Sequence, residues 1–283
     1  MKHAYLIMAH NQFGMLANLV ELLDHVDNDI YIHIDAKAKD FCREPVLERV
    51  KYSSIKFVEP IKIYWGEASQ IFCELNLLTE ATKKSYDYYH LLSGVDMPLK
   101  SQAEIHDFFA ANNGRNFISF VPEISKNVVG RVKYYHLRRG GLFSKVLNRL
   151  SITIQKICGV NRNGDLEIYK GSNWFSITDD FARYIVARQS QIRRQFVYTL
   201  CADEVFLHTY FMASPFVDTL YKSEEGMSAN CRLIRWENEL PHVFVLGDFE
   251  ELVTTHNLFA RKFDENIDNE IIEKIFAIVR SRS

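Results

Sequence analysis

The stretch HAYLIMAHNQFGMLANLVELLDHVDNDIYIHID, residues 3–35, decides the fold class. It begins with an apolar run at 3–9, continues with apolar residues at helical spacing through 15–26, and ends with an alternating run at 30–35. Short apolar or alternating runs are typical of strands, whereas a period near 3.6 is typical of an amphipathic helix. The stretch therefore predicts a strand–helix–strand unit with two parallel strands.

The same alternation continues outward along the chain. SIKFV at 54–58 and DYYHLLS at 87–93 predict two further strands, and residues 67–84 between them have helical spacing. The predicted fold is α/β, with a Rossmann-like, mostly parallel central sheet flanked by helices. Ligands of such sheets bind beyond the carboxyl ends of the strands. The first candidate side chains are therefore those that directly follow a predicted strand: His10, Asn11, Asp35 and Asp96.

The second half of the chain adds further elements. GSNWFSITDDFARYIV at 171–186 predicts a strand followed by a helix that Thr178 caps. CADEVFLHTYF at 201–211 predicts a short helix, NCRLIRW at 230–236 predicts a strand, and the chain ends in a long amphipathic helix at about 269–281.

The composition is that of a soluble globular protein. The 283 residues are 47% hydrophobic and 25% charged, with a net charge of −2, which argues against general nucleic-acid binding. We find no secretory signal and no run near the roughly 20 apolar residues of a membrane-spanning helix. Five scattered cysteines without a CxxC pair indicate reduced thiols. We expect a single cytoplasmic domain over residues 1–283.

Residues 124–164 form a strongly basic segment without any Asp or Glu. Its nine cationic side chains are Lys126, Arg131, Lys133, Arg138, Arg139, Lys145, Arg149, Lys156 and Arg162. A charge run is often a solvated face. The alternative, which we favour, is a surface that meets an anionic partner: a glycolipid phosphate, an acidic glycan or the inner face of an anionic membrane, to which the protein would bind peripherally.

Two acids that follow predicted strands have two interpretations each. Asp35 either bonds the base or ribose of a nucleotide or forms a turn. Asp96 in HLLSGVDMPLK either offers a carboxylate at the rim of the sheet or is an ordinary turn residue. Gly94 before it permits close approach of a backbone, and Pro98 after it fixes the chain.

Two motifs combine aromatic residues with a possible donor contact. YWGEASQ at 64–70, with Trp65, is either an aromatic plug over a helix start or a surface on which a nucleotide base stacks. LFARKFD at 258–264 places Arg261 and Lys262 between two phenylalanines. That pair is either an ordinary basic surface or the charge that offsets a diphosphate.

The chain also contains the triplet Asp27-Asn28-Asp29, which resembles a metal-binding Asp-x-Asp pair. It precedes a predicted strand, so we interpret it as a helix-to-strand turn at the wrong end of the sheet. Elsewhere no His or carboxylate cluster has the spacing of metal ligands. His208 in the 201–211 helix is more typical of a packed histidine than of a catalytic one.

The motifs IHID, YWGEASQ, HLLSGVDMP, GSNWF, ADEVFLHT, RLIRW and LFARKFD occur in this order between about residues 3 and 265. Together they resemble glycosyltransferase family 14, the core-2/I-branching N-acetylglucosaminyltransferases with the peptide O-xylosyltransferases. The resemblance covers nearly the whole chain, and its sharpest motifs are LFARKFD and the Asp-Glu pair.

The resemblance implies a GT-A fold and inverting transfer from a UDP-sugar, UDP-GlcNAc before UDP-xylose, to a hydroxyl of a glycan or glycolipid without a metal cofactor. It places Glu204 as general base, Lys262 at the donor diphosphate and Asp35 at the nucleotide. For a second cation at the diphosphate, Arg235, Arg232 and Arg261 remain alternatives.

The other expected assignments follow the same division of roles. We assign His10, Trp65, Arg235 and Arg261 to the donor side and Asp96, Asp203 and Trp174 to substrate binding. Asp203 is further expected to hold the N-terminus of the helix that follows it, leaving Glu204 to face the acceptor. The lack of an anchor and of a disulfide framework is typical of a compact bacterial member that builds a surface polysaccharide or lipid-linked glycan.

Two other functions remain as alternatives. A nucleotidyltransferase on a similar sheet would need a Gly-rich phosphate loop after the first strand, and AHNQFG does not provide one. A non-catalytic subunit that binds a nucleotide-sugar or a glycan is the alternative from another class.

Overall fold

The computed structural model describes residues 1–136, 142–223, 226–238 and 240–282. Within that part of the chain the main sheet has six strands in the order β3-β2-β1-β4-β7-β6. Their bounds are β1 His3–Ala9, β2 Asn28–Ile34, β3 Ser54–Phe57, β4 Tyr88–Ser93, β6 Phe117–Phe120 and β7 Gly171–Thr178. β1 to β4 are parallel, and β7 runs antiparallel to both of its neighbours. The predicted α/β fold with a mostly parallel sheet is confirmed.

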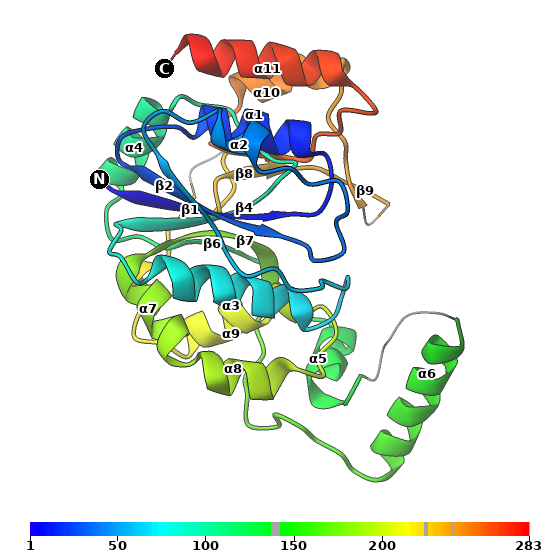
Figure 1. Cartoon of the computed structure of the whole chain (residues 1–283). Coiled ribbons are helices and arrows are strands. Elements are labelled where there is room, and N and C mark those ends of the chain that lie inside the picture. Colours follow the sequence, from blue (N-terminus) through cyan, green and yellow to red (C-terminus); the bar gives the residue numbers. More distant parts are fainter. Residues whose placement is uncertain (137–141, 224–225, 239, 283) are drawn as a thin grey trace.

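Helices cover both faces of this sheet (Figure 1). One face carries α1 Phe13–Leu22, α2 Glu44–Leu47 and α4 Gln102–Ala111. The other carries α3 Ser69–Ala81, α7 Asp179–Ala187, α8 Gln189–Phe196 and α9 Phe206–Met212. Each face buries its own cluster of apolar side chains against the sheet, so the strands are enclosed on both sides.

A third layer packs outside α1. The C-terminal helix α11 spans Asn269–Ser281, and α10 spans Phe249–Thr254. Ile271 and Ile275 of α11 share an apolar cluster with Met15 and Leu22 of α1. The predicted bounds of this last helix are confirmed, and Asp268 caps it by accepting a hydrogen bond from the Ile271 N–H.

A smaller sheet lies beside the carboxyl end of β4. It has the order β5-β11-β8, with β5 Met97–Pro98, β8 Arg232–Ile234 and β11 Phe259–Arg261. β11 pairs antiparallel with β5 and parallel with β8. This pairing brings the turn with Asp96 next to the LFARK segment, although 165 residues separate Asp96 from Arg261.

Some predicted boundaries were wrong. The helix expected through residue 26 ends at Leu22, because Asp24 instead accepts the backbone N–H groups of the segment before β3. The strand expected at 230–236 is divided into β8 and the short β9 Trp236–Glu237, which forms a hairpin with β10 Leu240–Pro241. Thr178 does cap α7, as predicted, by accepting from the Phe181 N–H.

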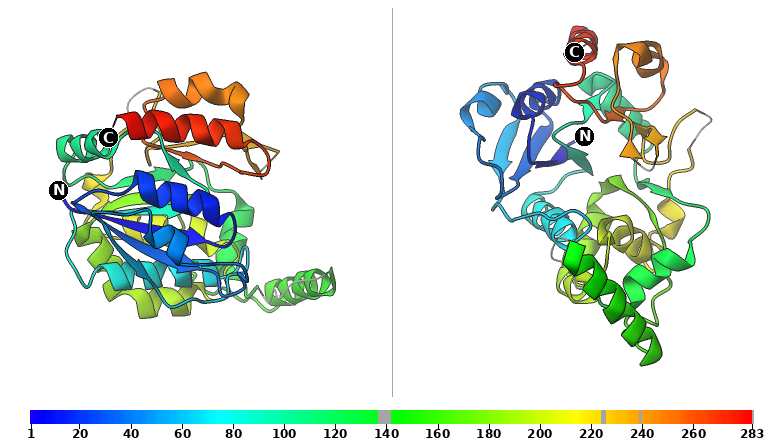
Figure 2. Two further views of the ribbon diagram at one scale, coloured as in Figure 1. Left: turned by 45° about the horizontal axis from the view of Figure 1, so that its top comes forward. Right: turned by 90° about the vertical axis from the view of Figure 1, so that its right-hand side faces the viewer.

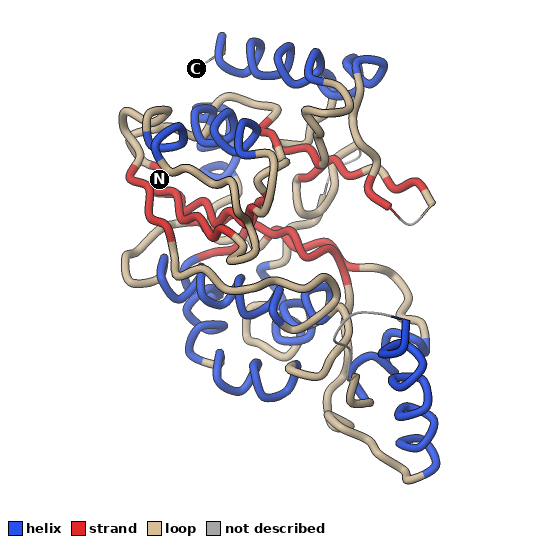
Figure 3. The backbone as a smooth tube through the Cα atoms, turned by 45° about the vertical axis from the view of Figure 1, so that its right-hand side comes forward, coloured by secondary structure: helices blue, strands red, loops and turns tan. Residues whose placement is uncertain are grey.

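The basic segment contains two helices, α5 Lys126–Lys133 and α6 Leu142–Ile157. Figures 2 and 3 show α6 standing away from the layered body of the molecule. Arg138 and Arg139 lie outside the described residues. All five cysteines are free thiols. In the described part of the chain, no helix is both long and apolar enough to span a bilayer.

Candidate active site

Asp35 and His10 lie at the carboxyl ends of β2 and β1. Asp35 is buried; its Oδ1 accepts from the Lys37 N–H at 2.9 Å, and its Oδ2 lies 3.5 Å from Lys37 Nζ. His10 lies at the surface, yet partial burial lowers its pKa, and the cations Arg261, Lys37 and Lys262 lower it further against the opposing effect of Asp35. Two of the predicted donor-side residues therefore share one electrostatic environment with the LFARK segment.

Asp96 and Arg261 form an ion pair across the smaller sheet. Arg261 Nη1 lies 2.8 Å from Oδ1 of the buried Asp96, whose Oδ2 accepts from the Ser93 N–H at 2.9 Å. Burial raises the pKa of Asp96, and Arg261 opposes that shift. The guanidinium also lies over the Trp174 ring, 4.5 Å from its centroid. Arg261 thus contacts two other predicted site residues, which come from a separate turn and strand.

Lys262 differs from the other cations of this region. Its side chain is partly exposed and has no hydrogen-bond or ion-pair partner among the described residues, whereas Arg261 already has Asp96. A cation without a protein partner remains available to an anionic ligand. Lys262 lies close enough to His10 to lower its pKa, and His10 directly follows β1. Lys262 is therefore near the carboxyl end of β1.

The other two arginines proposed for the diphosphate have protein partners. Arg235 pairs with Asp248 and lies 3.0 Å from Glu251, and it also contacts His242. Arg232 is fully buried and donates to the carbonyl oxygens of Leu91 and Phe175. Burial lowers the pKa of Arg232 to about 10. Of the three alternatives, only Arg261 contacts another predicted site residue.

The YWGEASQ segment joins the donor side to the Asp-Glu pair. Trp65 is 80% exposed, and Lys37 lies over the neighbouring Tyr64 ring, 4.7 Å from its centroid. Gly66, at φ 74°, accepts from the Cys201 N–H at 2.9 Å. An open indole is thus held directly beside the turn that carries Glu204.

Glu204 lies in a short 3₁₀ helix, Ala202–Glu204, before α9. Its Oε2 lies 3.1 Å from Arg131 Nη1 and 3.0 Å from Lys170 Nζ. Both contacts use the same oxygen, so Oε1 has no partner among the described residues. About a third of the side chain is exposed. The carboxylate is therefore held by two cations at one oxygen and keeps a second oxygen without a protein partner among the described residues.

Asp203 does not hold the N-terminus of α9, so the predicted cap was wrong. That helix has no side-chain cap, because the acids precede it in a separate 3₁₀ turn. Asp203 is instead buried, and its Oδ2 accepts from Gln70 Nε2 of α3 at 3.0 Å. Burial, with the neighbouring Glu204 charge, raises its pKa to about 6. The hydrogen bond from Gln70 holds the Asp203–Glu204 turn against α3.

Glu74, one helical turn beyond Gln70, adds a second buried acid. It is fully buried, and neither carboxyl oxygen has a hydrogen-bond partner among the described residues. Burial first, and then Asp203, raise its pKa well above the usual range. No sequence motif predicted Glu74, Gln70, Lys170 or the pairing of Arg131. The lack of acids across 124–164 was the one signal that pointed toward Arg131.

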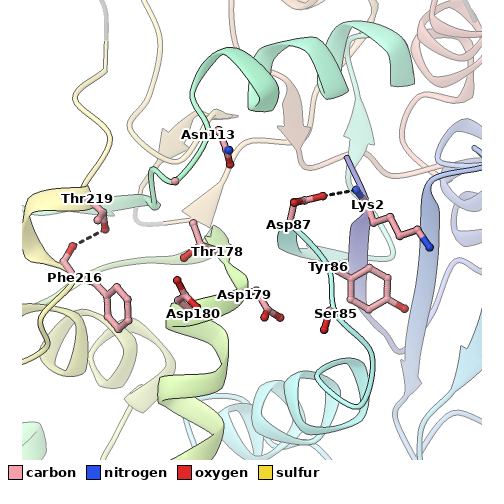
Figure 4. A pocket seen from close by; sticks show the side chains of 11 residues that line it. Lys2, Ser85, Tyr86, Asp87, Asn113, Thr178, Asp179, Asp180, Phe216 and Thr219 are labelled. Atoms are coloured by element: carbon pink, nitrogen blue, oxygen red, sulfur yellow. Dashed lines mark hydrogen bonds between the residues drawn. The ribbon is translucent and has the colours of Figure 1, made fainter.

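The opposite end of the sheet carries a separate feature. A cavity of about 470 Å³ opens there, lined by residues that include Lys2, Asp87, Thr178 and Phe216 (Figure 4). None of the predicted site residues lines it. The Asp27-Asn28-Asp29 triplet also belongs to this end, because β2 begins at Asn28 while Asp35 follows its other end.

Two further predictions concern histidines and metal ligands. His208 is fully buried, and its Nε2–H donates to the Ser119 carbonyl oxygen at 3.1 Å. Burial lowers its pKa to about 4, so the predicted packed role is confirmed. Within the described ranges, no group of three or more His, Cys, Asp or Glu side chains has the geometry to hold a metal ion.

Acids and cations from several elements lie near the carboxyl ends of the strands, which is where ligands of α/β sheets bind. Residues 3–253 match the family model of the Core-2/I-branching enzymes, and the chain belongs to that family. The resemblance found in the sequence is thereby confirmed.

Several curated relatives of the chain are xylosyltransferases. Xylosyltransferase 2 of Rattus norvegicus is 25% identical over 292 residues, which cover 95% of this chain and 33% of that protein. The Homo sapiens protein of the same name is 25% identical over 293 residues, with the same two shares. The chain thus spans about a third of the length of the curated relatives it matches.

Solved structures are more distant. That of mouse xyloside xylosyltransferase 1 in its apo form is 10% identical, with a TM-score of 0.39 over 91% of this chain and 96% of its own.

Proposed function

We propose that the protein is an inverting glycosyltransferase that moves a sugar from a UDP-sugar to a hydroxyl group of a glycan or glycolipid. The observation that carries the proposal is the state of Glu204. Arg131 and Lys170 fix one of its oxygens, and the other remains open. A general base needs this combination of a fixed position and a free lone pair.

The chemistry uses one base and one cation. As the acceptor oxygen attacks the anomeric carbon, its proton passes to Oε1 of Glu204, because an alcohol is a poor nucleophile at neutral pH. The bond between that carbon and the diphosphate breaks on the opposite face of the sugar, and UDP leaves. A single displacement of this kind inverts the anomeric configuration without a covalent sugar–enzyme intermediate.

Lys262 is assigned to the departing diphosphate. Its ammonium has no protein partner among the described residues, so a bound anion would be its first. Negative charge grows on the leaving group in the transition state, and a fixed cation stabilises that state more than the ground state. Asp35 and the exposed Trp65 are assigned to the nucleotide on the same edge of the sheet.

Two donors are proposed in a stated order. GlcNAc is the first, as the family resemblance implies, and xylose is the second, supported by the names of the curated relatives. GlcNAc carries both a hydroxymethyl group at C5 and an acetamido group at C2 that xylose lacks, so a pocket that accepts GlcNAc need not exclude the smaller pentose.

A donor screen tests the proposal. UDP release is measured with UDP-GlcNAc, UDP-xylose, UDP-GalNAc, UDP-glucose and UDP-galactose, without acceptor and then with glycan acceptors. We expect slow hydrolysis of one donor that accelerates when an acceptor is added. A binding subunit would release no UDP from any donor, and that result would overturn the proposal.

A further inference from the structure

Helix α6 has an inverted pattern of polar and apolar faces. Its apolar residues Val146, Leu147, Leu150, Ile154 and Ile157 are between 48% and 82% exposed. At 100° per residue they fall within an arc of roughly 100° along one side of the helix. Soluble proteins rarely leave such a continuous apolar stripe in water.

The polar side of α6 faces the protein instead. Gln155 Nε2 donates to the Tyr135 carbonyl oxygen at 3.0 Å, and its Oε1 accepts from the Tyr135 N–H at 2.7 Å. Asn148, which lies on the same face of α6 as Gln155, is buried. Polar contacts thus fix the helix to the segment after α5, while the apolar stripe stays exposed. Figures 2 and 3 show that the helix itself stands away from the layered body.

Cations accompany the stripe. Arg149 and Lys156 are exposed on the flank between the apolar stripe and the body, and Lys156 lies 5.7 Å from the centroid of the Tyr134 ring. Lys126, Arg131 and Lys133 of α5 line a cavity of about 500 Å³ that also includes Ile152 and Lys156 of α6. No acid occurs anywhere in 124–164.

We propose that α6 is an interfacial helix that docks the protein on an anionic lipid bilayer. An apolar stripe with Lys and Arg beside it is the arrangement by which a helix lies in the plane of a membrane surface. The stripe would enter the boundary between headgroups and acyl chains, and the flanking cations would lie at the level of the lipid phosphates.

Charge favours a bilayer over a second copy of the chain. Two α6 helices packed through their stripes would bring two basic flanks together without a single acid in 124–164 to pair with them. An anionic bilayer offers the opposite charge over an area large enough for the whole segment. Docking through α6 would also bring α5, and with it Arg131 beside Glu204, close to the lipid surface.

Sedimentation with vesicles tests the proposal without donor or acceptor, so its outcome is independent of the transfer activity. The whole protein is mixed with vesicles of phosphatidylcholine alone or with phosphatidylserine. We expect binding to the anionic vesicles that weakens as salt is raised. The double variant Ile154→Ser/Ile157→Ser should bind at least tenfold more weakly, since each buried aliphatic side chain contributes strongly to transfer out of water.

A matched variant controls for loss of exposed apolar surface in general. Val26→Ser/Ile267→Ser removes two exposed aliphatic side chains from other parts of the molecule and should bind like the parent protein. Arg149→Gln should reduce the preference for phosphatidylserine and leave the circular dichroism spectrum unchanged. Equal binding by the two double variants, or no binding by the parent, would overturn the proposal. The proposal would also be overturned if light scattering showed that the parent protein is a dimer and that Ile154→Ser/Ile157→Ser is a monomer.

Discussion

Arg131 Nη1 lies 3.1 Å from Oε2 of Glu204, and this ion pair joins the basic segment to the proposed general base. Lys170 contacts the same oxygen at 3.0 Å. Both cations are only about a quarter exposed, so solvent screens them less than an open surface pair. The position of Glu204 therefore depends on two side chains that precede it by more than 30 residues in the sequence.

Arg131→Ala should lower kcat by about tenfold and leave the KM for the donor nearly unchanged, because the base loses a positioning contact while donor contacts remain. Arg131→Lys should restore part of kcat by keeping a cation there. Lys133→Ala on the same helix is the control and should retain kcat. A change in donor KM alone would show that Arg131 acts on the donor instead.

Lys262→Ala should weaken binding of UDP by about tenfold and reduce kcat, since the diphosphate loses a charge-assisted contact. Isothermal titration with UDP measures the affinity. The free energy of unfolding should stay within about 0.5 kcal/mol of the parent, because the side chain has no ion-pair partner within the described ranges. Unchanged UDP affinity would remove Lys262 from the site.

Arg261→Ala should instead be destabilising. Its removal leaves the buried Asp96 carboxylate without its ion-pair partner, which costs about 3 kcal/mol. Urea unfolding at neutral pH measures the loss. Arg261→Lys should recover part of it, although a lysine cannot lie over the Trp174 ring as the guanidinium does. A stable Arg261→Ala protein would contradict the structural role of this pair.

Glu74→Gln should make stability less dependent on pH. The raised pKa means that folded Glu74 keeps its proton after the unfolded chain, with a pKa near 4.3, has released it. Over that window the parent loses up to about 1.4 kcal/mol of stability per pH unit as pH rises. The free energy of unfolding of the variant, measured with urea and taken relative to that of the parent, should therefore increase from pH 5 to pH 7. Glu48→Gln, at an exposed position, is the control. If the stability difference between Glu74→Gln and the parent were the same at pH 5 and pH 7, the assignment would be refuted.

Chelation tests the expectation of metal-free chemistry. The assignment of Lys262 to the diphosphate leaves no required role for a divalent cation at the leaving group. UDP release and transfer should continue at full rate in excess EDTA. A rate that vanishes in EDTA and returns with Mn²⁺ would contradict this expectation.

Much of the fold could be predicted because its elements have strong local signals. β1 and α11 have the bounds expected from their apolar patterns, and Thr178 caps α7 as its sequence indicates. The wrong boundaries have nonlocal causes. Asp24 ends α1 early by binding the chain before β3, and no local pattern contains that contact.

The site was less predictable for the same reason. The motifs identified Asp96, Arg261 and Glu204, but pairing partners such as Lys170 and Gln70 come from other elements and carry no motif. Asp203 was misjudged because an acid at an apparent helix start looks like a cap. Its burial against α3 depends on how the 3₁₀ helix Ala202–Glu204 packs, which the local sequence does not encode.

Glu204→Gln tests the central claim most directly. Gln keeps the shape of the side chain and removes its basicity, so sugar transfer should fall by about 10²- to 10⁴-fold while UDP affinity, measured by titration, stays within about twofold. Exposed Glu167→Gln is the matched control and should transfer at the parental rate. Retained transfer in Glu204→Gln, or a loss of UDP binding equal to the loss of transfer, would contradict the role of Glu204 as the general base.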